Sequence, residues 1–109
     1  MPSKNVKIVV TIPESHADAL RRAIGDTGAG TLGNYTHCSV SSKVTGRFLL
    51  NDSALPTIGT VGVPEAVEEE RIEVTCRRKN LPAVIAVIKV NHPYEEIALD
   101  VYPLEDFEL

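Results

Sequence analysis

Apolar and polar residues alternate along three segments of the chain, at residues 6–12, 71–77 and 97–102. Alternation with a period of two is typical of a β-strand that buries one face. We therefore predict three strands, each with one face toward the core. The apolar faces consist of Val6, Ile8, Val10 and Ile12 in residues 6–12, of Ile72, Val74 and Cys76 in residues 71–77, and of Ile97, Leu99 and Val101 in residues 97–102.

A helix is predicted directly after the first strand. Pro13 and Glu14 suit a first helical turn, because proline lacks an amide hydrogen that would have no partner there and an acid favours the helix N-terminus. Apolar residues then recur every three or four positions up to Ile24, and Gly25 follows as a stop signal.

Residues 81–90, LPAVIAVIKV, suit either a strand or a helix. The valines and isoleucines favour a strand, whereas Asn80 is a good N-cap and Pro82 falls in the first helical turn. An internal symmetry decides for a helix. A strand, a proline-marked helix and a strand opened by tyrosine occur twice, at residues 6–40 and 71–102.

The second strand is expected to begin near Tyr35, followed by a hairpin-like extension at residues 43–50 and a long connection rich in glycine and proline. The resulting βαβ-βαβ order predicts an α+β, ferredoxin-like fold. Its antiparallel sheet would have the strand order 4-1-3-2, with both helices on one face.

The composition indicates one compact domain over residues 1–109, because 43% of the residues are hydrophobic and 24% are charged. The net charge is −4 and no lysine-rich run is present, so nucleic-acid binding is disfavoured. The first residues do not resemble a signal peptide, and no apolar stretch is long enough to span a membrane, so we expect a cytoplasmic protein without membrane contact. Cys38 and Cys76 lack CxxC spacing and are expected to be buried and reduced.

Two motifs carry candidate chemistry. GAGTLG, residues 28–33, has the letters of a dinucleotide fingerprint, but its glycines follow a helix and precede a strand, which reverses the required order. A helix stop and a tight turn explain these glycines, although their free backbone amides could hold a small anion. HPYEE, residues 92–96, is explained by a helix stop and a strand start, or by an acid–base pair of His92 and Glu95. No nucleophile or oxyanion site accompanies that pair, so an enzyme is disfavoured.

Histidine, cysteine and glutamate side chains also supply the ligand types of a divalent transition metal. In the predicted sheet, the second and fourth strands form opposite edges, roughly 14 Å apart, and run in opposite directions. His37 and His92 therefore lie at diagonal corners. A metal site of His37, His92 and Glu95 is possible across a subunit boundary and not within one chain.

Several segments together resemble one known domain, namely GAGTLGNYTHCS, TGRF, PTIG, VGVPEAVEEERIE and HPYEEIALDVYPL. They are similar to the CutA/PII-like middle domain of the YqfO-type proteins, the family of NGG-interacting factor three, often called GTP cyclohydrolase 1 type 2 homologues. The resemblance covers nearly the whole chain and implies a ferredoxin-like fold that associates as trimers. The dinuclear metal site of the family is built from segments flanking this domain, so the resemblance assigns no catalytic residue here. Leu50 departs from the family, which usually has a proline at this position.

The expected function is that of a small oligomeric binding or regulatory module that occurs alone, with a small-molecule ligand in clefts between subunits. The alternative is a divalent-cation-binding protein of the CutA type, with a divalent metal ion as its cofactor. The candidate ligand-binding residues are Gly28, Gly30, Gly33, Asn34 and Tyr35 in the loop, and His92, Tyr94, Glu95 and Glu96 in the HPYEE segment.

Open sheet edges favour self-association. A four-stranded sheet has two edge strands and one uncovered face, where unpaired backbone groups and apolar side chains invite contact with another chain. We expect Val9, Val40, Ala98 and Tyr102 to point outward there. Closed association would cover them, and the family resemblance points to a homotrimer.

Overall fold

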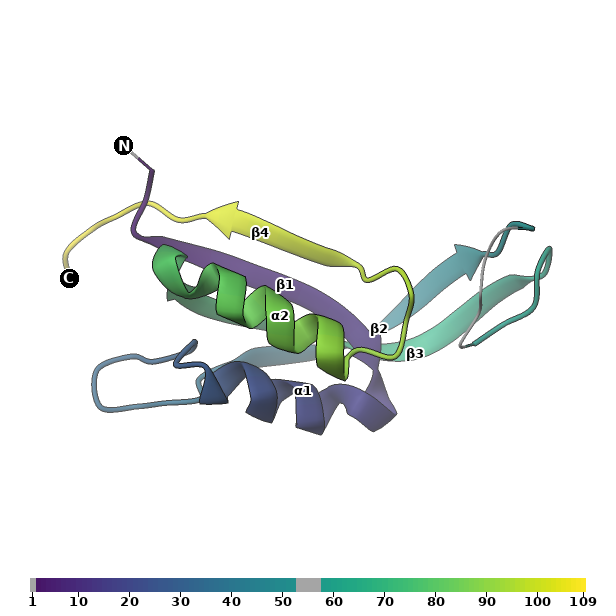
Figure 1. Ribbon diagram of the computed structural model, residues 1–109, viewed down its shortest axis with the longest axis horizontal. Helices are drawn as coiled ribbons and strands as arrows, with labels where there is room; N and C mark the ends of the chain where they lie inside the picture. The colour runs from purple at the N-terminus through teal and green to yellow at the C-terminus, as the bar shows by residue number, and fades with distance from the viewer. Residues whose placement is uncertain (1, 53–57) are drawn as a thin grey trace.

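The computed structural model describes residues 2–52 and 58–109. Within these ranges the chain forms a four-stranded antiparallel sheet in the order β2-β3-β1-β4, with both helices on one face (Figure 1). The predicted ferredoxin-like fold is confirmed. The elements are β1 (Asn5–Pro13), α1 (Glu14–Asp26), β2 (Val40–Leu49), β3 (Pro64–Arg77), a 3₁₀ turn (Arg78–Asn80), α2 (Leu81–Asn91) and β4 (Leu99–Pro103).

The core lies between the sheet and the two helices. The apolar faces predicted for β1 and β3 are buried, and Leu20 and Ile24 of α1 pack against them. Each fully buried side chain of this size contributes roughly 1.5–3 kcal/mol. Ile97, Leu99 and Val101, before and within the edge strand β4, are partly buried against the same core.

The ambiguous run at residues 81–90 is helical, as the internal symmetry predicted. Asn80 is the N-cap, although its side chain makes no capping hydrogen bond, and α2 buries Val84 and Ile88. Its apolar residues continue around to the outer surface, where Val90 is exposed. In the described parts of the chain, neither helix is long and apolar enough to cross a membrane.

The second strand begins at Val40, not near Tyr35 as predicted, because a loop occupies the residues between them. The Cys38 amide donates to the Gly30 carbonyl at 2.8 Å, and the Gly30 amide donates to Thr75 at 2.9 Å. These bonds hold the loop against the end of β3. Cys38 is consequently half-buried in a loop and not buried in a strand, whereas Cys76 is buried as expected, and both are free thiols.

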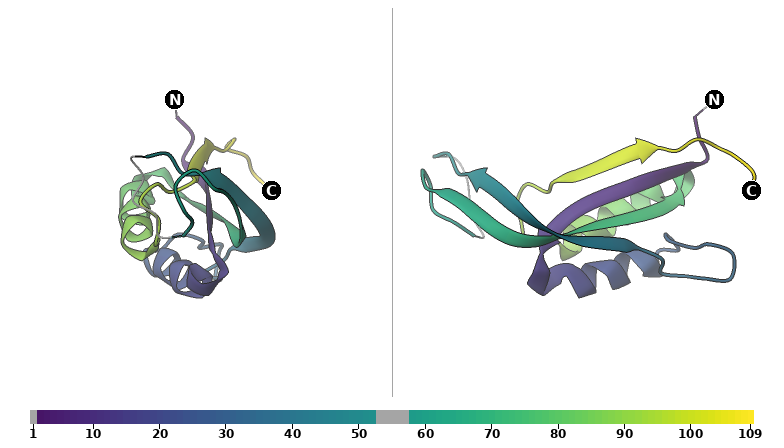
Figure 2. Two further views of the ribbon diagram at one scale, coloured as in Figure 1. Left: turned by 90° about the vertical axis from the view of Figure 1, so that its right-hand side faces the viewer. Right: turned by 180° about the vertical axis from the view of Figure 1, so that it is seen from behind.

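Strands β2 and β3 extend as a long arm beyond the helices (Figures 1 and 2). Residues 64–68 of β3 pair with β2 alone, whereas β1 joins the pairing from Glu69 onward. The third strand therefore starts earlier than its alternating segment predicted. We name β2 residues 45–49 and β3 residues 64–68 the arm. The predicted connection includes residues 53–57, which lie outside the described residues.

Val9 is buried, with 5% of its surface exposed, although its place on the uncovered face predicted an outward position. It lies on a central strand between Glu73 of β3 and Asp100 of β4, so neighbours on both sides shield it. Val40 is 65% exposed on the opposite edge strand, and Ala98 and Tyr102 are also exposed, as expected.

Candidate functional site

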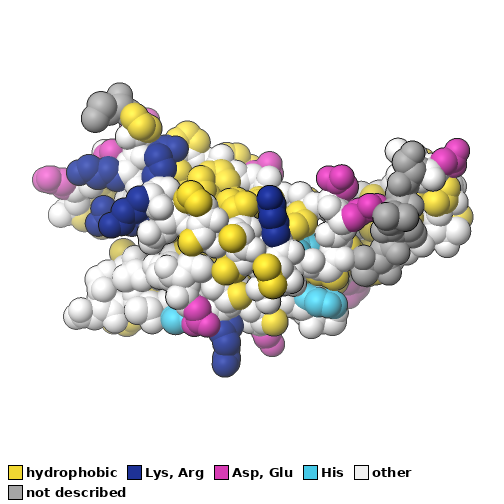
Figure 3. Space-filling model, viewed as in Figure 1, with side chains coloured by type: hydrophobic (Ala, Val, Ile, Leu, Met, Phe, Trp, Pro, Cys, Tyr) yellow, Lys and Arg dark blue, Asp and Glu magenta, His cyan; other side chains and the backbone are white. Residues whose placement is uncertain are grey.

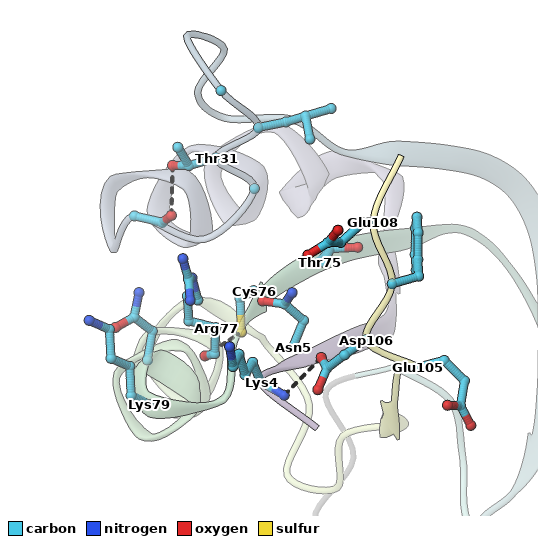
Figure 4. A pocket seen from close by; sticks show the side chains of 16 residues that line it. Lys4, Asn5, Thr31, Thr75, Cys76, Arg77, Lys79, Glu105, Asp106 and Glu108 are labelled. Carbon is cyan, nitrogen blue, oxygen red and sulfur yellow. Dashed lines mark hydrogen bonds between the residues drawn. The ribbon is translucent and has the colours of Figure 1, made fainter. Parts of the chain in front are cut away.

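An open cleft of about 1050 Å³ lies at the end of the molecule that carries both chain termini (Figure 4). Three parts of the chain line it. They are the glycine-rich loop after α1, the start of β1 together with the end of β3 and the following 3₁₀ turn, and residues 105–108 near the C-terminus. Segments that are distant in sequence therefore form one concave surface, which is the usual form of a small-molecule site.

The glycine-rich loop owes its course to left-handed backbone conformations. Gly28, Gly30 and Gly33 have φ angles of 97°, 77° and 57°. A Cβ atom on Gly30 would lie 2.4 Å from the Cys38 carbonyl oxygen, so no other residue fits there without a shift. The loop follows α1 and precedes β2, as the sequence order required, and it does not have the strand-to-helix setting of a dinucleotide fingerprint.

The candidate loop residues divide into two groups. Gly28, Gly30 and Gly33 line the cleft. Asn34 and Tyr35 belong to the tip of the loop, where the backbone groups of Leu32 and Tyr35 bond each other at 2.8 and 2.9 Å. Tyr35 projects into solvent and is 73% exposed.

Three cations that sequence reasoning did not select also line the cleft, namely Lys4, Arg77 and Lys79. Their signal in the sequence is the RRK run at the end of β3, at residues 77–79. Figure 3 shows lysine and arginine side chains gathered at this end of the molecule. None of these three side chains forms an ion pair with another described residue.

The remaining charges of the cleft belong to residues 105–108. Asp106 accepts a hydrogen bond from the Lys4 backbone amide at 3.2 Å, and Glu105 and Glu108 flank it. The Cys76 thiol in the lining is not an activated nucleophile, because burial raises its pKa and keeps it protonated. The cleft can therefore bind a charged ligand, and its lining supplies no group poised for covalent chemistry.

His37 fastens the glycine-rich loop to the end of α1. Its Nε2 atom lies 2.9 Å from Asp26 Oδ1, and its Nδ1 atom lies 3.1 Å from Thr36 Oγ1. The ring lies directly against Gly25, where an added Cβ would come within 2.1 Å of the imidazole Cδ2. His37 itself has a φ of 58°, so the loop holds it in an unusual backbone conformation.

His92 has a structural position at the other end of the molecule. Its Nε2–H donates to the Thr11 carbonyl at 2.7 Å, and its Nδ1 accepts from the Tyr94 amide at 3.2 Å. These partners fix the neutral tautomer protonated on Nε2. Burial lowers the pKa of His92, although the bond to Thr11 and the charge of Glu69 partly oppose that effect. A metal ion at His92 would have to displace one of the two hydrogen bonds.

A carboxylate whose burial the sequence did not indicate lies beside the HPYEE segment. Glu69 is 5% exposed, and the absence of a side chain at Gly46 leaves room for it, since a Cβ there would lie 1.9 Å from Glu69 Oε1. The Tyr94 hydroxyl is buried without a hydrogen-bonding partner of suitable geometry among the described residues. Burial, together with the nearby Glu69 carboxylate, raises the pKa of Tyr94 to about 12. The Tyr94 ring also contacts Phe48 edge to face, at 6.2 Å between centroids.

The two predicted histidine ligands are far apart in one chain. His37 bonds Asp26, the last residue of α1, whereas His92 bonds Thr11, just before α1 begins. The helix between these points has 13 residues and is therefore about 20 Å long. Among the described residues, no group of three histidine, cysteine or acidic side chains could hold a metal ion. The cross-subunit site of His37, His92 and Glu95 stays a prediction.

Comparison with solved structures first defines the class of fold. The CutA of Archaeoglobus fulgidus, described as a periplasmic divalent cation tolerance protein, matches 95% of this chain and 87% of its own, with a TM-score of 0.71 and 18% identity. Bacillus subtilis GlnK matches 94% of this chain and 86% of its own, with a TM-score of 0.62 and 16% identity. The chain therefore has the CutA/PII-like form of the ferredoxin-like fold.

Sequence comparison then gives closer relatives. GTP cyclohydrolase 1 type 2 homologues of Mycobacterium tuberculosis and Bacillus subtilis are 43% and 42% identical to it, over 90% and 91% of this chain. A Bacillus cereus protein related to NIF3 is 42% identical over 97% of the chain, with a TM-score of 0.83. The resemblance predicted from the sequence is confirmed. The chain spans 26% of the length of these two homologues and 27% of the B. cereus protein. No known family model matches this chain.

Proposed function

We propose that the chain is a small homo-oligomeric binding module that holds a charged small molecule and has no catalytic activity of its own. The observation that carries this proposal is the open cleft between the glycine-rich loop and residues 105–108, whose lining offers charged groups without an activated nucleophile. The activity in the name of the longer relatives would then require parts of those proteins outside the matched quarter.

We further propose that the module is a trimer. The edge strand β2 exposes Val40 and Leu49. In the arm, β3 pairs with β2 on one side, and no described strand pairs with it on the other. Such edges favour pairing with another chain, and closed cyclic association covers every edge alike. Within one subunit, the glycine-rich loop and the HPYEE segment lie at opposite ends of the folded molecule. Only a second subunit could therefore bring them into one cleft.

Light scattering at micromolar concentration tests the association. The expected mass is about 35 kDa, three times the 11.8 kDa of one chain. Val40→Glu should lower this mass, because it places a charge on the edge of the sheet. Val90→Glu is the matched control on the exposed surface of α2. A wild-type mass near that of one chain would contradict the trimer.

A divalent-cation site across subunits is the alternative prediction, supported by the likeness of the fold to a divalent cation tolerance protein. Calorimetric titration with zinc and copper tests it. Tight uptake that is abolished by His37→Ala, with an unchanged melting temperature, would favour the cation site. Indifference of the wild-type protein to both metals would eliminate it.

A further inference from the structure

We propose that the cleft is an anion site that binds phosphorylated small molecules through Lys4, Arg77 and Lys79. This inference deepens the proposed function and rests on it for the idea of a small charged ligand. It concerns one chain and does not require the trimer.

The three cations come from separate parts of the fold. Lys4 precedes β1, Arg77 ends β3, and Lys79 lies in the 3₁₀ turn before α2. Like charges that are gathered on one surface repel each other, and no described acidic side chain pairs with these three. Glu105, Asp106 and Glu108 also line the cleft and equal the cations in number, but no ion pair among the described residues neutralises any of the three cations. An anionic ligand would relieve the repulsion.

The facing loop adds backbone donors. The amides of Gly30 and Leu32 donate within the protein, to Thr75 and Tyr35. The amides of Thr31 and Gly33 donate to no acceptor in the described residues, and both residues line the cleft. Two free backbone amides beside left-handed glycines can donate to phosphate oxygens, which accept several hydrogen bonds at once.

The size of the cleft favours a ligand larger than inorganic phosphate. A volume of about 1050 Å³ is at the upper end of the range for small-molecule pockets, so a nucleotide or another phosphorylated metabolite can be accommodated. The shared chemistry is the phosphate group. A probe that carries a nucleoside and one that lacks it distinguish a nucleotide from another phosphorylated metabolite.

Residues 105–108 add a competing charge. Asp106 is directed toward the backbone of Lys4, whereas the Glu105 side chain points away from the three cations (Figure 4). These carboxylates oppose the binding of an anion in the same cleft. Neutralising them should therefore strengthen binding, an effect that a purely structural role of the cations would not produce.

The test is calorimetric titration of the full chain with pyrophosphate and with ATP at low ionic strength. Both probes should bind, and Arg77→Ala combined with Lys79→Ala should weaken binding at least tenfold. The matched control is Arg22→Ala combined with Lys89→Ala, which removes the same two residue types from exposed helix positions. It should change the affinity less than twofold. Tighter binding of ATP than of pyrophosphate would identify a nucleotide, and equal affinities would identify the phosphate group alone.

A second variant keeps the test independent of folding defects. Glu105→Gln, Asp106→Asn and Glu108→Gln together should tighten pyrophosphate binding several-fold. Absence of binding in both the wild-type protein and this variant would overturn the inference, and so would equal weakening by the two alanine pairs. Light scattering on the same samples separates the proposals. A trimer that binds neither probe contradicts this inference alone, whereas a monomer that binds through Arg77 contradicts the trimer alone.

Discussion

The hydroxyl of Tyr94 is buried beside the Glu69 carboxylate without a hydrogen-bonding partner among the described residues. Glu69 lies close enough to raise the pKa of the phenol, but the two groups do not have the geometry of a hydrogen bond, so the hydroxyl has lost its bonds to water without a full replacement. We expect Tyr94→Phe to raise the free energy of unfolding by about 1 kcal/mol, because the ring and its contact with Phe48 are retained. Urea denaturation measures the change. Tyr102→Phe is the control, and a loss of stability in Tyr94→Phe would show that the hydroxyl is bonded.

The same variant has a signature at alkaline pH. The pKa of Tyr94 is raised from its ordinary value of 10.0 to about 12, so the folded protein favours the neutral phenol. The resulting stability is fully present below pH 10.0 and is lost as the pH rises toward 12. Tyr94→Phe should remove this part of the decrease in the free energy of unfolding at alkaline pH.

His92 gives a pH dependence on the acid side. Its pKa in the folded protein lies below its ordinary value of 6.5, so folding favours the neutral ring. The stability from the neutral ring is present above pH 6.5 and decreases as the pH falls below that value, because the unfolded chain then binds more protons. We expect His92→Gln to flatten the loss of stability between about pH 7 and pH 5 in chemical denaturation.

The control for that experiment is His16→Gln, because His16 is exposed on α1 and its charge is the smallest of the effects on the pKa of His92. This variant should lose nearly as much stability as the wild-type protein when the pH falls through the same range. If wild-type and His92→Gln proteins lose stability in parallel over that range, the buried neutral imidazole is not the cause.

At the scale of elements, the glycine-rich loop depends on one position more than on its neighbours. Gly30 and Gly33 both have positive φ angles, so alanine at either costs about 1–2 kcal/mol in backbone strain. A Cβ at Gly30 would also meet the Cys38 backbone, whereas at Gly33 it would meet nothing within 4 Å. Gly30→Ala should therefore lower the free energy of unfolding more than Gly33→Ala, as measured by thermal and urea denaturation. Equal losses would show that the loop adjusts around Gly30.

The strands and helices were predictable to different degrees. Alternation along β1 identified its buried face, because successive side chains point to opposite faces of the sheet and the two helices cover only one of them (Figure 1). The start of β2 was missed because His37 and Cys38 are held by tertiary hydrogen bonds that leave no periodic pattern. The burial of Glu69 was equally invisible, since it depends on the missing side chain of Gly46 on the neighbouring strand.

At the scale of the whole molecule, the candidate site was only half predictable. The glycines were recognised from their motif, but Lys4, Arg77 and Lys79 become neighbours only when β1 pairs with β3 in the observed register, which brings Asn5 opposite Arg77. The HPYEE segment was recognised for its polar residues, yet His92 turns out to satisfy backbone groups. Sequence spacing predicts periodic contacts well, whereas the convergence of single charges depends on the completed sheet.

The adjacency of the two chain ends has a mechanical consequence. Val6 near the start of β1 pairs with Pro103 at the end of β4, and the Leu104 amide donates to Asn5 at 3.1 Å. A force that pulls the two ends apart acts along the hydrogen bonds between these antiparallel strands, which lie perpendicular to the strand axis. The bonds are then loaded one after another and not all together. We expect β4 to separate from β1 under a small force, one hydrogen bond after another. The more extensive β1–β3 pairing should break only afterwards.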